Sequence, residues 1–292
     1  MLISGKELAN EVKDQIRERV EKLKETYGRE PHLVLILVGD DPASRTYVAG
    51  KYNDANSVGF RVTRLHLSAA TTEKDLLALI DRLNGDLTTD AILVQLPLPD
   101  HINEQKIINS INPHKDVDGF HPENIAALWQ RREGYVPCTP RGIIRMLDWK
   151  GIEIDGKHAV VVGRGNIVGL PVSKLLLDRN ATVTLTHSRT PDLGSLTRQA
   201  DILIVAAGSI GLIHGDMIKP GAIVIDVGIN RNPETGKLCG DVIFEECEKV
   251  AGMITPVPGG VGPMTKACLL ENTVECFIDN ENRNRNSSMM TI

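Results

Sequence analysis

The sequence lacks the features that mark disulfide-stapled, membrane-spanning and nucleic-acid-binding proteins. Its five cysteines are scattered, odd in number and without Cys-x-x-Cys spacing, which argues against a disulfide framework or a metal site and favours a reducing compartment. No apolar run approaches the roughly 20 residues that a membrane span needs. The first residues form neither a signal peptide nor an Arg-rich transit segment, so we expect a cytoplasmic protein. With a formal net charge of −5 and no long basic run, we expect no nucleic-acid or membrane partner.

What the sequence does contain is an alternation of apolar strands and amphipathic helices. Its 292 residues, 41% hydrophobic and 24% charged, are typical of a globular protein of two domains. Predicted strands lie at about 33–38, 61–67, 91–96, 158–162, 181–186, 202–206 and 222–226. Predicted helices lie at about 5–27, 42–58, 72–83, 103–110 and 263–278, with crossover helices between most of the later strands. This order predicts an α/β fold in both halves. The Asn-rich tail from Asp279 is predicted to be disordered.

The centre of the sequence holds a strand, a glycine-rich turn and a helix in succession. Three β-branched residues, Val160–Val162, indicate a buried strand, and glycines follow at 163, 165 and 169. An apolar-periodic segment and a second β-rich run come next. Glycines let the backbone approach a pyrophosphate, and free N–H groups at a helix start favour the anion. We therefore predict a dinucleotide site, although glycine turns of this kind also occur in α/β folds without one.

The end of the second strand indicates which dinucleotide binds. An NAD site usually has Asp or Glu there to accept from the ribose 2′-hydroxyl, whereas an NADP site needs cations and hydroxyls. Here His187, Ser188 and Arg189 follow the strand, Arg164 lies in the glycine turn, and no acid is among them. A guanidinium can pair bidentately with a 2′-phosphate. We predict NADP, the alternative being that Arg189 is a solvated loop charge.

Polar side chains elsewhere suggest an acid–base site. Tyr47 and Lys51 are four residues apart on a predicted helix and share one face. Alone, the pair is more typical of a surface lysine beside a half-buried tyrosine. However, Gln95 ends a predicted buried strand and Asp118 lies in a polar loop after the next helix. Because ligands of open α/β sheets collect at the carboxyl ends of strands, these side chains could converge on one site.

Seven segments of the chain, in order, carry a resemblance to a known family. They are Tyr47-x-x-x-Lys51, Val94-Gln-Leu-Pro-Leu-Pro99, Lys115-Asp-Val-Asp-Gly119, Pro137-Cys-Thr-Pro140, Val162-Gly-Arg-Gly-Asn-Ile-Val-Gly169, Asp226-Val-Gly-Ile-Asn230 and Pro256-Val-Pro-Gly-Gly-Val-Gly-Pro-Met264. Together they resemble the bifunctional 5,10-methylenetetrahydrofolate dehydrogenase/cyclohydrolase family in its short bacterial form.

The resemblance implies a fold and an activity. It implies two α/β domains flanking a cleft, the second a Rossmann-like NADP-binding domain, with the C-terminal helix packing back on the first. The expected boundaries are 1–119, completed by the helix 263–279, for the folate-binding catalytic domain, 120–262 for the NADP domain and 280–292 for a disordered tail. The enzyme would be a homodimer that oxidises 5,10-methylenetetrahydrofolate with NADP⁺ and hydrolyses the methenyl product to 10-formyltetrahydrofolate.

The resemblance also implies residue roles. Lys51 would be the acid/base group, Gln95 would hold and tune it, Tyr47 would stack on the folate, and Asp118 would hold the pterin. A lysine can serve only if its surroundings lower its pKa, and an uncharged partner orients the amine without fixing the ammonium form. The expected cofactor-binding residues are Gly163, Arg164, Gly165, Ser188, Arg189, Ile229 and Thr139. The expected substrate-binding residues are Tyr47, Lys51, Gln95, Leu96, Asp118, Pro258, Gly259 and Gly260.

Two departures and two alternatives accompany this interpretation. The family commonly has Ser where this chain has Gly165, which removes one phosphate contact. It usually has an apolar residue where this chain has Lys266, which we expect to be exposed, the alternative being a position near the folate's anionic glutamate tail. An NADP-dependent dehydrogenase of the shikimate or amino-acid type would use Lys51 and Asp118 as an acid/base pair on a small polar substrate, with no role for Gln95. A nucleotide-sensing regulator would need no acid/base lysine.

Overall fold

The computed structural model describes residues 1–289, so the last three residues of the tail predicted to be disordered, 290–292, lie outside the described residues. The chain divides into two compact units. The five-stranded unit comprises Met1–Asn10 and Pro137–Cys268, and the three-stranded unit comprises Glu11–Val136 and Leu269–Ile292. Helices α1 (Gly5–Tyr27) and α10 (Val261–Met289) each contribute residues to both units. The chain of the three-stranded unit continues past Gly119 to Val136.

The three-stranded unit is built on a parallel sheet in the order β2-β1-β3. Its strands are β1 (His32–Val38), β2 (Arg61–Leu67) and β3 (Ala91–Val94). The central strand β1 is buried at every position, as its unbroken apolar run predicts for a strand covered on both faces. The strand predicted at 91–96 ends at Val94. Pro97 has no N–H with which to continue the ladder of hydrogen bonds.

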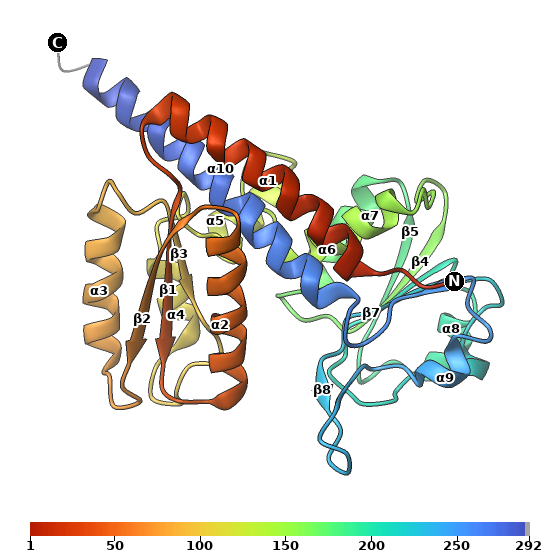
Figure 1. Ribbon diagram of the computed structural model, residues 1–292. Coiled ribbons are helices and arrows are strands. Elements are labelled where there is room, and N and C mark those ends of the chain that lie inside the picture. Colours follow the sequence, from red (N-terminus) through yellow and green to blue (C-terminus); the bar gives the residue numbers. More distant parts are fainter. Residues whose placement is uncertain (290–292) are drawn as a thin grey trace. The chain divides into compact units, whose positions relative to one another are not determined.

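Helices cover both faces of this sheet. Helix α2 (Pro42–Ser57) begins with the predicted cap, in which the Asp41 carboxylate accepts from the Ser44 N–H at 2.7 Å. Helix α3 (Glu73–Gly85) lies across the sheet from α2 (Figure 1). With α4 (Glu104–Ser110) it packs on the face that carries alternate residues of β1 and β3. A further helix, α5 (Pro122–Gln130), was not predicted.

The five-stranded unit has a parallel sheet in the order β10-β7-β6-β4-β5. The strands are β4 (His158–Val162), β5 (Thr182–Thr186), β6 (Ile202–Val205), β7 (Ile223–Asp226) and β10 (Met253–Ile254). The connecting helices are α6 (Cys138–Trp149), α7 (Gly169–Asp178), α8 (Leu193–Thr197), the 3₁₀ turn η1 (Gly215–Met217) and α9 (Phe244–Cys247). An antiparallel hairpin joins β8 (Asn230–Arg231) to β9 (Leu238–Cys239).

The strand order of this unit creates a switch point. The chain leaves β4 for β5 on one side and returns to β6 on the other. Loops that follow β4 and β6 therefore diverge at the carboxyl edge, where ligands of doubly wound sheets bind. The predicted α/β class with a Rossmann-like second domain is confirmed.

The C-terminal helix corrects one prediction and confirms another. Helix α10 continues to Met289, so the prediction of disorder from Asp279 is wrong as far as residue 289. The tail is ordered by contacts with residues far away in the sequence, which its own composition cannot reveal. The Asn280 amide donates to the Asp90 carboxylate at 2.7 Å, and the Arg29 guanidinium reaches both Asp90 and Glu281 at 2.7 Å. The helix thereby packs on the unit that carries β1–β3, as expected.

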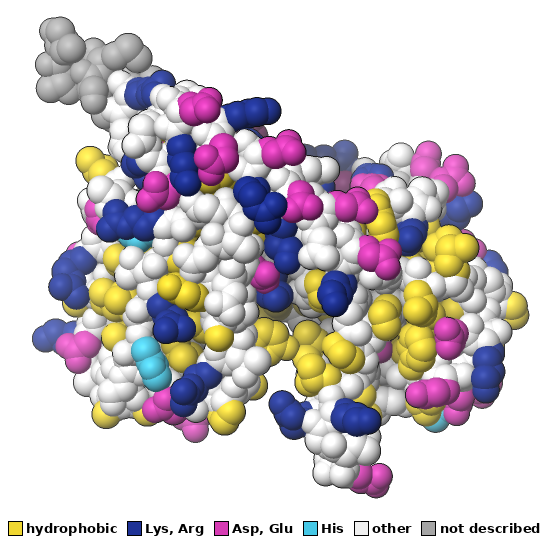
Figure 2. Space-filling view, in the orientation of Figure 1, with side chains coloured by type: hydrophobic (Ala, Val, Ile, Leu, Met, Phe, Trp, Pro, Cys, Tyr) yellow, Lys and Arg dark blue, Asp and Glu magenta, His cyan; other side chains and the backbone are white. Residues whose placement is uncertain are grey.

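The face drawn in Figure 2 shows no extended patch of a single charge among the described residues. On the face drawn in Figure 2, basic and acidic side chains are interspersed over both long helices and the loops. Among residues 1–289, no helix is long and apolar enough to cross a membrane. The same residues hold no cluster of three or more His, Cys, Asp and Glu side chains that could bind a metal ion.

Candidate functional site

The glycine turn after β4 is a backbone cradle. Gly163 has φ +109°, and a Cβ there would lie 2.1 Å from the carbonyl oxygen of Ala206. A Cβ on Gly169, the first residue of α7, would lie 2.0 Å from the carbonyl oxygen of Gly163. Both positions therefore exclude every side chain. Between them the turn is exposed up to Ile167, so its N–H groups and the start of α7 are available to an anion.

The residues predicted to select NADP lie at the same sheet edge. Val162 pairs with Thr186 in the β4–β5 register, so the glycine turn and the loop after β5 emerge side by side. Arg164, Ser188 and Arg189 are all exposed there. In the part of the chain that the structure describes, no carboxylate pairs with either guanidinium. A 2′-phosphate would thus meet two uncompensated cations and a hydroxyl, which is the donor set that NADP requires.

The other predicted cofactor residues differ in their surroundings. A Cβ on Gly165 would meet no atom within 4 Å, so packing does not demand glycine at this departure from the family pattern. The Thr139 hydroxyl is 2.9 Å from that of Thr265, and no hydrogen bond joins it to the glycine turn among the described residues. Ile229 is 47% exposed, a large apolar side chain left open to solvent. Lys266, expected to be exposed, is partly buried.

Lys51 and Gln95 meet in the three-stranded unit. The Lys51 ammonium Nζ on α2 donates to Gln95 Oε1 at 3.1 Å. The Gln95 amide donates in turn to the Leu96 carbonyl at 2.6 Å, which fixes the amide oxygen toward the lysine. The Gln95 N–H donates to Ile36 of β1 at 2.8 Å, so the residue is anchored to the sheet. The lysine is half-buried, and its partner carries no charge.

The segment 115–119 contributes one free carboxylate. Burial lowers the pKa of Lys115, whose ammonium donates to the Leu83, Asn84 and Asp86 carbonyls and so caps the end of α3. Burial raises the pKa of Asp116 to about 6, although this carboxylate accepts from the N–H groups of Gly119 and His121. These two side chains are structural.

Asp118, two residues further on, is in a different state. Burial raises the pKa of Asp118, while the nearby positive charge of Lys51 opposes the rise. No other residue from 1 to 289 gives this carboxylate a hydrogen bond. A partly buried carboxyl group that lies close to Lys51 and has no protein donor is ready to accept N–H groups from a ligand. Tyr47, one turn before Lys51 on α2, is 39% exposed, and partial burial raises the pKa of its phenol.

The Pro-Gly-Gly loop belongs to the five-stranded unit. Pro258 follows a cis peptide bond, and Gly259 has φ +108°. The Gly259 carbonyl accepts from the Lys6 N–H at 3.1 Å, and the Gly260 carbonyl oxygen would lie 1.8 Å from a Cβ on Gly5. The loop is therefore held by the first turn of α1. The predicted substrate residues Tyr47, Lys51, Gln95, Leu96 and Asp118 are all in the three-stranded unit.

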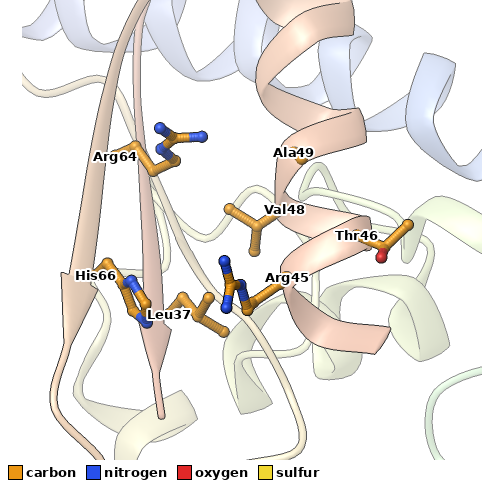
Figure 3. A pocket seen from close by; sticks show the side chains of 7 residues that line it. All are labelled: Leu37, Arg45, Thr46, Val48, Ala49, Arg64 and His66. Carbon is orange, nitrogen blue, oxygen red and sulfur yellow. The ribbon is translucent and has the colours of Figure 1, made fainter. Parts of the chain in front are cut away.

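A cavity of about 400 Å³ lies on the other face of α2 (Figure 3). Arg45, Arg64 and His66 line it, and Asp40 compensates two of them, at 3.6 Å from Arg45 and 3.3 Å from His66. Arg45 and Val48 line the cavity from one face of α2. Tyr47 and Lys51 lie on another face of the helix. This cavity contains none of the predicted site residues.

The loop after β6 was not among the residues predicted from the sequence to lie at the cofactor site. Residues 207–210 are exposed, and the Ala206 carbonyl oxygen contacts the glycine turn. The available signal was the position of this loop, because it follows the strand adjacent to β4. The short apolar run 202–206 alone does not show which strand is its neighbour.

Comparison with known proteins gives two family matches that together span most of the chain. The profile described as the tetrahydrofolate dehydrogenase/cyclohydrolase catalytic domain matches residues 3–118, and the NAD(P)-binding domain of the same family matches residues 137–281. A protein of Halothermothrix orenii named bifunctional protein FolD is 56% identical over 276 residues, which cover 94% of this chain and 96% of the relative.

Solved structures agree. The bifunctional methylenetetrahydrofolate dehydrogenase/cyclohydrolase FolD of Campylobacter jejuni has a TM-score of 0.93 at 50% identity and covers 97% of this chain and 99% of its own. The Trypanosoma brucei enzyme complexed with NADP cofactor and inhibitor has a TM-score of 0.91 at 42% identity, covering 96% and 97%. A shikimate dehydrogenase of Aquifex aeolicus, at a TM-score of 0.51 and 14% identity over 83% of this chain and 97% of its own, shows a shared fold alone.

Proposed function

Because the chain belongs to the tetrahydrofolate dehydrogenase/cyclohydrolase family, we propose that the Lys51–Gln95 pair and Asp118 carry its acid–base chemistry on folate. The enzyme oxidises 5,10-methylenetetrahydrofolate to the methenyl form with NADP⁺ and hydrolyses that product to 10-formyltetrahydrofolate. The observation that carries the proposed roles is the lysine–amide hydrogen bond of 3.1 Å beside a carboxylate without a hydrogen-bond donor.

The dehydrogenase step needs binding and orientation from the protein. Bound NADP⁺ accepts the hydride, and the folate nitrogens stabilise the cation that forms. The proposed task of Gly163 and Gly165 is to let the backbone approach the pyrophosphate. Arg164, Ser188 and Arg189 hold the 2′-phosphate, and Ile229 and Thr139 line the dinucleotide. The exposed, uncompensated guanidinium groups support this assignment.

The cyclohydrolase step needs proton movement. Water adds to the methenyl carbon, and the ring opens when one ring nitrogen is protonated. In the proposed mechanism the Lys51 amine takes the proton from the attacking water and returns it to that nitrogen. Gln95 orients the amine without adding a negative charge that would hold it as ammonium. Asp118 accepts N–H groups of the pterin, and Tyr47 stacks on the folate ring.

The remaining substrate assignments follow the family resemblance. We propose that Leu96 and the loop Pro258–Gly260 border the bound folate. We also propose the division into a folate-binding catalytic domain, residues 1–119 completed by 263–279, and an NADP-binding domain, residues 120–262.

One assay tests the proposal and separates it from the alternatives. Purified protein is mixed with methylenetetrahydrofolate and NADP⁺, and the methenyl product is followed by its absorbance as it forms and then decays. We expect both phases. A dehydrogenase of the shikimate type would leave the folate unchanged and oxidise a small polar alcohol instead. A nucleotide-sensing regulator would bind NADP⁺ and turn over neither substrate.

We further propose that the enzyme acts in the cytoplasm as a homodimer, without membrane or nucleic-acid partners. None of the five cysteines forms a disulfide bond in the described structure, which suits a reducing compartment. The dimer is taken from the family resemblance. Sedimentation velocity checks it, because a species of 31.9 kDa alone would contradict it.

A further inference from the structure

Two exposed segments of the five-stranded unit follow strands at the same edge of the sheet as the glycine turn. One is the loop 207–209 after β6, and the other is Ile229 after β7. Neither segment is helix or strand, so no backbone ladder fixes it. Both follow strands at the carboxyl edge, where a dinucleotide binds in such sheets. Something else must hold them in place.

The buried carboxylate of Asp241 holds both. Its side chain is fully buried. Oδ2 accepts from the N–H groups of Ala207 and Gly208 at 2.7 and 2.9 Å. Oδ1 accepts from the Ser209 N–H at 2.9 Å and from the Asn230 side-chain amide at 2.8 Å. Four N–H donors thus converge on one carboxylate, two on each oxygen.

A second buried carboxylate, that of Asp226, holds the segment that carries Asp241. Asp226, at the end of β7, accepts from the N–H groups of Gly228 at 2.9 Å and Asp241 at 3.0 Å. A Cβ on Gly240 would lie 1.7 Å from Asp226 Oδ2, and a Cβ on Gly228 would lie 2.5 Å from the Asp241 carboxylate. Gly240 therefore leaves space for the Asp226 carboxylate, and Gly228 leaves space for the Asp241 carboxylate. The residues on both sides of Ile229 are therefore fixed, Gly228 by Asp226 and Asn230 by Asp241.

We propose that Asp241 is a positioning residue for NADP, which presents the loop 207–209 and Ile229 to the dinucleotide beside the glycine turn. The proposal rests on the proposed function, because it requires NADP at this sheet edge. Asn cannot replace Asp241, since either orientation of the amide turns its NH₂ group toward two N–H donors. The fully satisfied carboxylate keeps the loops in one conformation before the ligand arrives.

Calorimetric titration with NADP⁺ tests the proposal on three full-length variants. Asp241→Asn should raise the Kd for NADP⁺ about 10- to 100-fold, as expected when binding groups are displaced by about 1 Å. Asn230→Ala removes one donor and leaves the carboxylate in place, so it should cause a smaller rise. Asp201→Asn is the matched control. Asp201 is a hydrogen-bonded carboxylate at the opposite end of β6, accepting from the His158 N–H and from Lys219.

A second readout separates positioning from general damage. Hydrolysis of methenyltetrahydrofolate requires no NADP⁺ and should keep its rate in Asp241→Asn. An unchanged Kd in folded Asp241→Asn would overturn the proposal, and so would an equal rise in Asp201→Asn. If Asp241→Asn does not fold, an unchanged Kd in Asn230→Ala overturns it instead. Failure of the proposed function is distinguishable, because the wild type itself would then neither bind NADP⁺ nor hydrolyse the folate.

Discussion

Two carboxylates of the five-stranded unit and one of the three-stranded unit have opposite surroundings. In the five-stranded unit, Asp226 and Asp241 accept hydrogen bonds from neighbouring N–H groups, and both are buried. In the three-stranded unit, Asp118 receives no hydrogen bond from any described residue, and Lys51 makes one bond to a neutral amide. Carboxylates whose oxygens all accept hydrogen bonds from the protein hold its loops in place. A partly buried carboxylate without a protein donor can still accept hydrogen bonds from a ligand.

The same contrast exists within one short segment. Asp116 and Asp118 are two residues apart, and burial raises the pKa of both. Asp116 nevertheless accepts from Gly119, His121 and Asn124, and Asp118 does not. Residue type and the direction of the pKa shift therefore do not distinguish a structural carboxylate from the one proposed to bind folate. The number of protein donors does.

Removing the lysine is expected to have the largest effect. Lys51→Met should reduce hydrolysis of methenyltetrahydrofolate about 10²- to 10⁴-fold, the usual contribution of a general acid/base. The fold should survive, because Lys51 is half-buried and its hydrogen-bond partner is one neutral amide. Stopped-flow absorbance measures the rate, and Lys106→Met, at an exposed ion pair with Glu73, is the control. Hydrolysis at the wild-type rate would remove Lys51 from the mechanism.

The two aspartates should respond differently to substitution. Asp118→Ala should weaken folate binding about 10- to 100-fold, since a hydrogen bond to a charged group contributes about 1.5–3 kcal/mol. Its melting temperature should be unchanged. Asp116→Ala should instead lower the free energy of unfolding, because three donors lose their acceptor. Titration and thermal unfolding of both variants provide the test. Equal folate affinity in wild type and Asp118→Ala would contradict the contrast between them.

The cofactor edge should show a selective effect. Arg164→Ala should raise the KM for NADP⁺ about 10-fold, the value of one charge-assisted hydrogen bond, and the KM for NAD⁺ much less. The reason is that the guanidinium has a partner only when the 2′-phosphate is present. Initial rates with each cofactor measure the ratio. Equal losses for NADP⁺ and NAD⁺ would show that Arg164 does not contact the phosphate.

The buried frame should produce a small dependence of stability on pH. Burial raises the pKa of Asp226 from 3.8 to about 6, so the folded protein binds this proton more tightly than the unfolded chain. Its contribution to stability is present below about pH 4 and is lost as the pH rises through 6. The stability of the wild type relative to Asp226→Asn should therefore fall across this range.

The contribution of Asp201 to stability should depend on pH in the opposite direction. The Lys219 ammonium lowers the pKa of Asp201, so its contribution is lost as the pH falls below the ordinary range of a carboxyl. Urea unfolding at a series of pH values compares wild type, Asp226→Asn and Asp201→Asn. Parallel profiles for wild type and Asp226→Asn would contradict the raised pKa.

Local sequence patterns predicted the elements that they themselves specify. The apolar run of β1, the Asp41–Pro42 helix start and the strand–glycine–helix succession at Gly163 all depend on adjacent residues. The family resemblance added the pairing of Lys51 with Gln95, whose hydrogen bond joins residues 44 positions apart in the sequence.

What escaped prediction depends on distant partners. The strands of β8, β9 and β10 have two residues each and carry no periodicity. The helical tail after Asp279 is ordered by Asp90 and Arg29, which its own composition cannot indicate. Asp241 is one acid after a glycine in the sequence. Its proposed role follows only from the four donors that two separate segments, 207–209 and Asn230, bring to it.

In the proposed mechanism an amine with an uncharged partner performs the hydrolysis, and the substitution Gln95→Glu changes only the charge of that partner. The change keeps the side chain's size and places a negative charge about 3.1 Å from Lys51 Nζ, which favours the ammonium form. Measured across pH with methenyltetrahydrofolate, hydrolysis by Gln95→Glu should be far slower than in the wild type near neutral pH and should recover as the pH is raised. A rate and pH profile identical to those of the wild type would contradict the account.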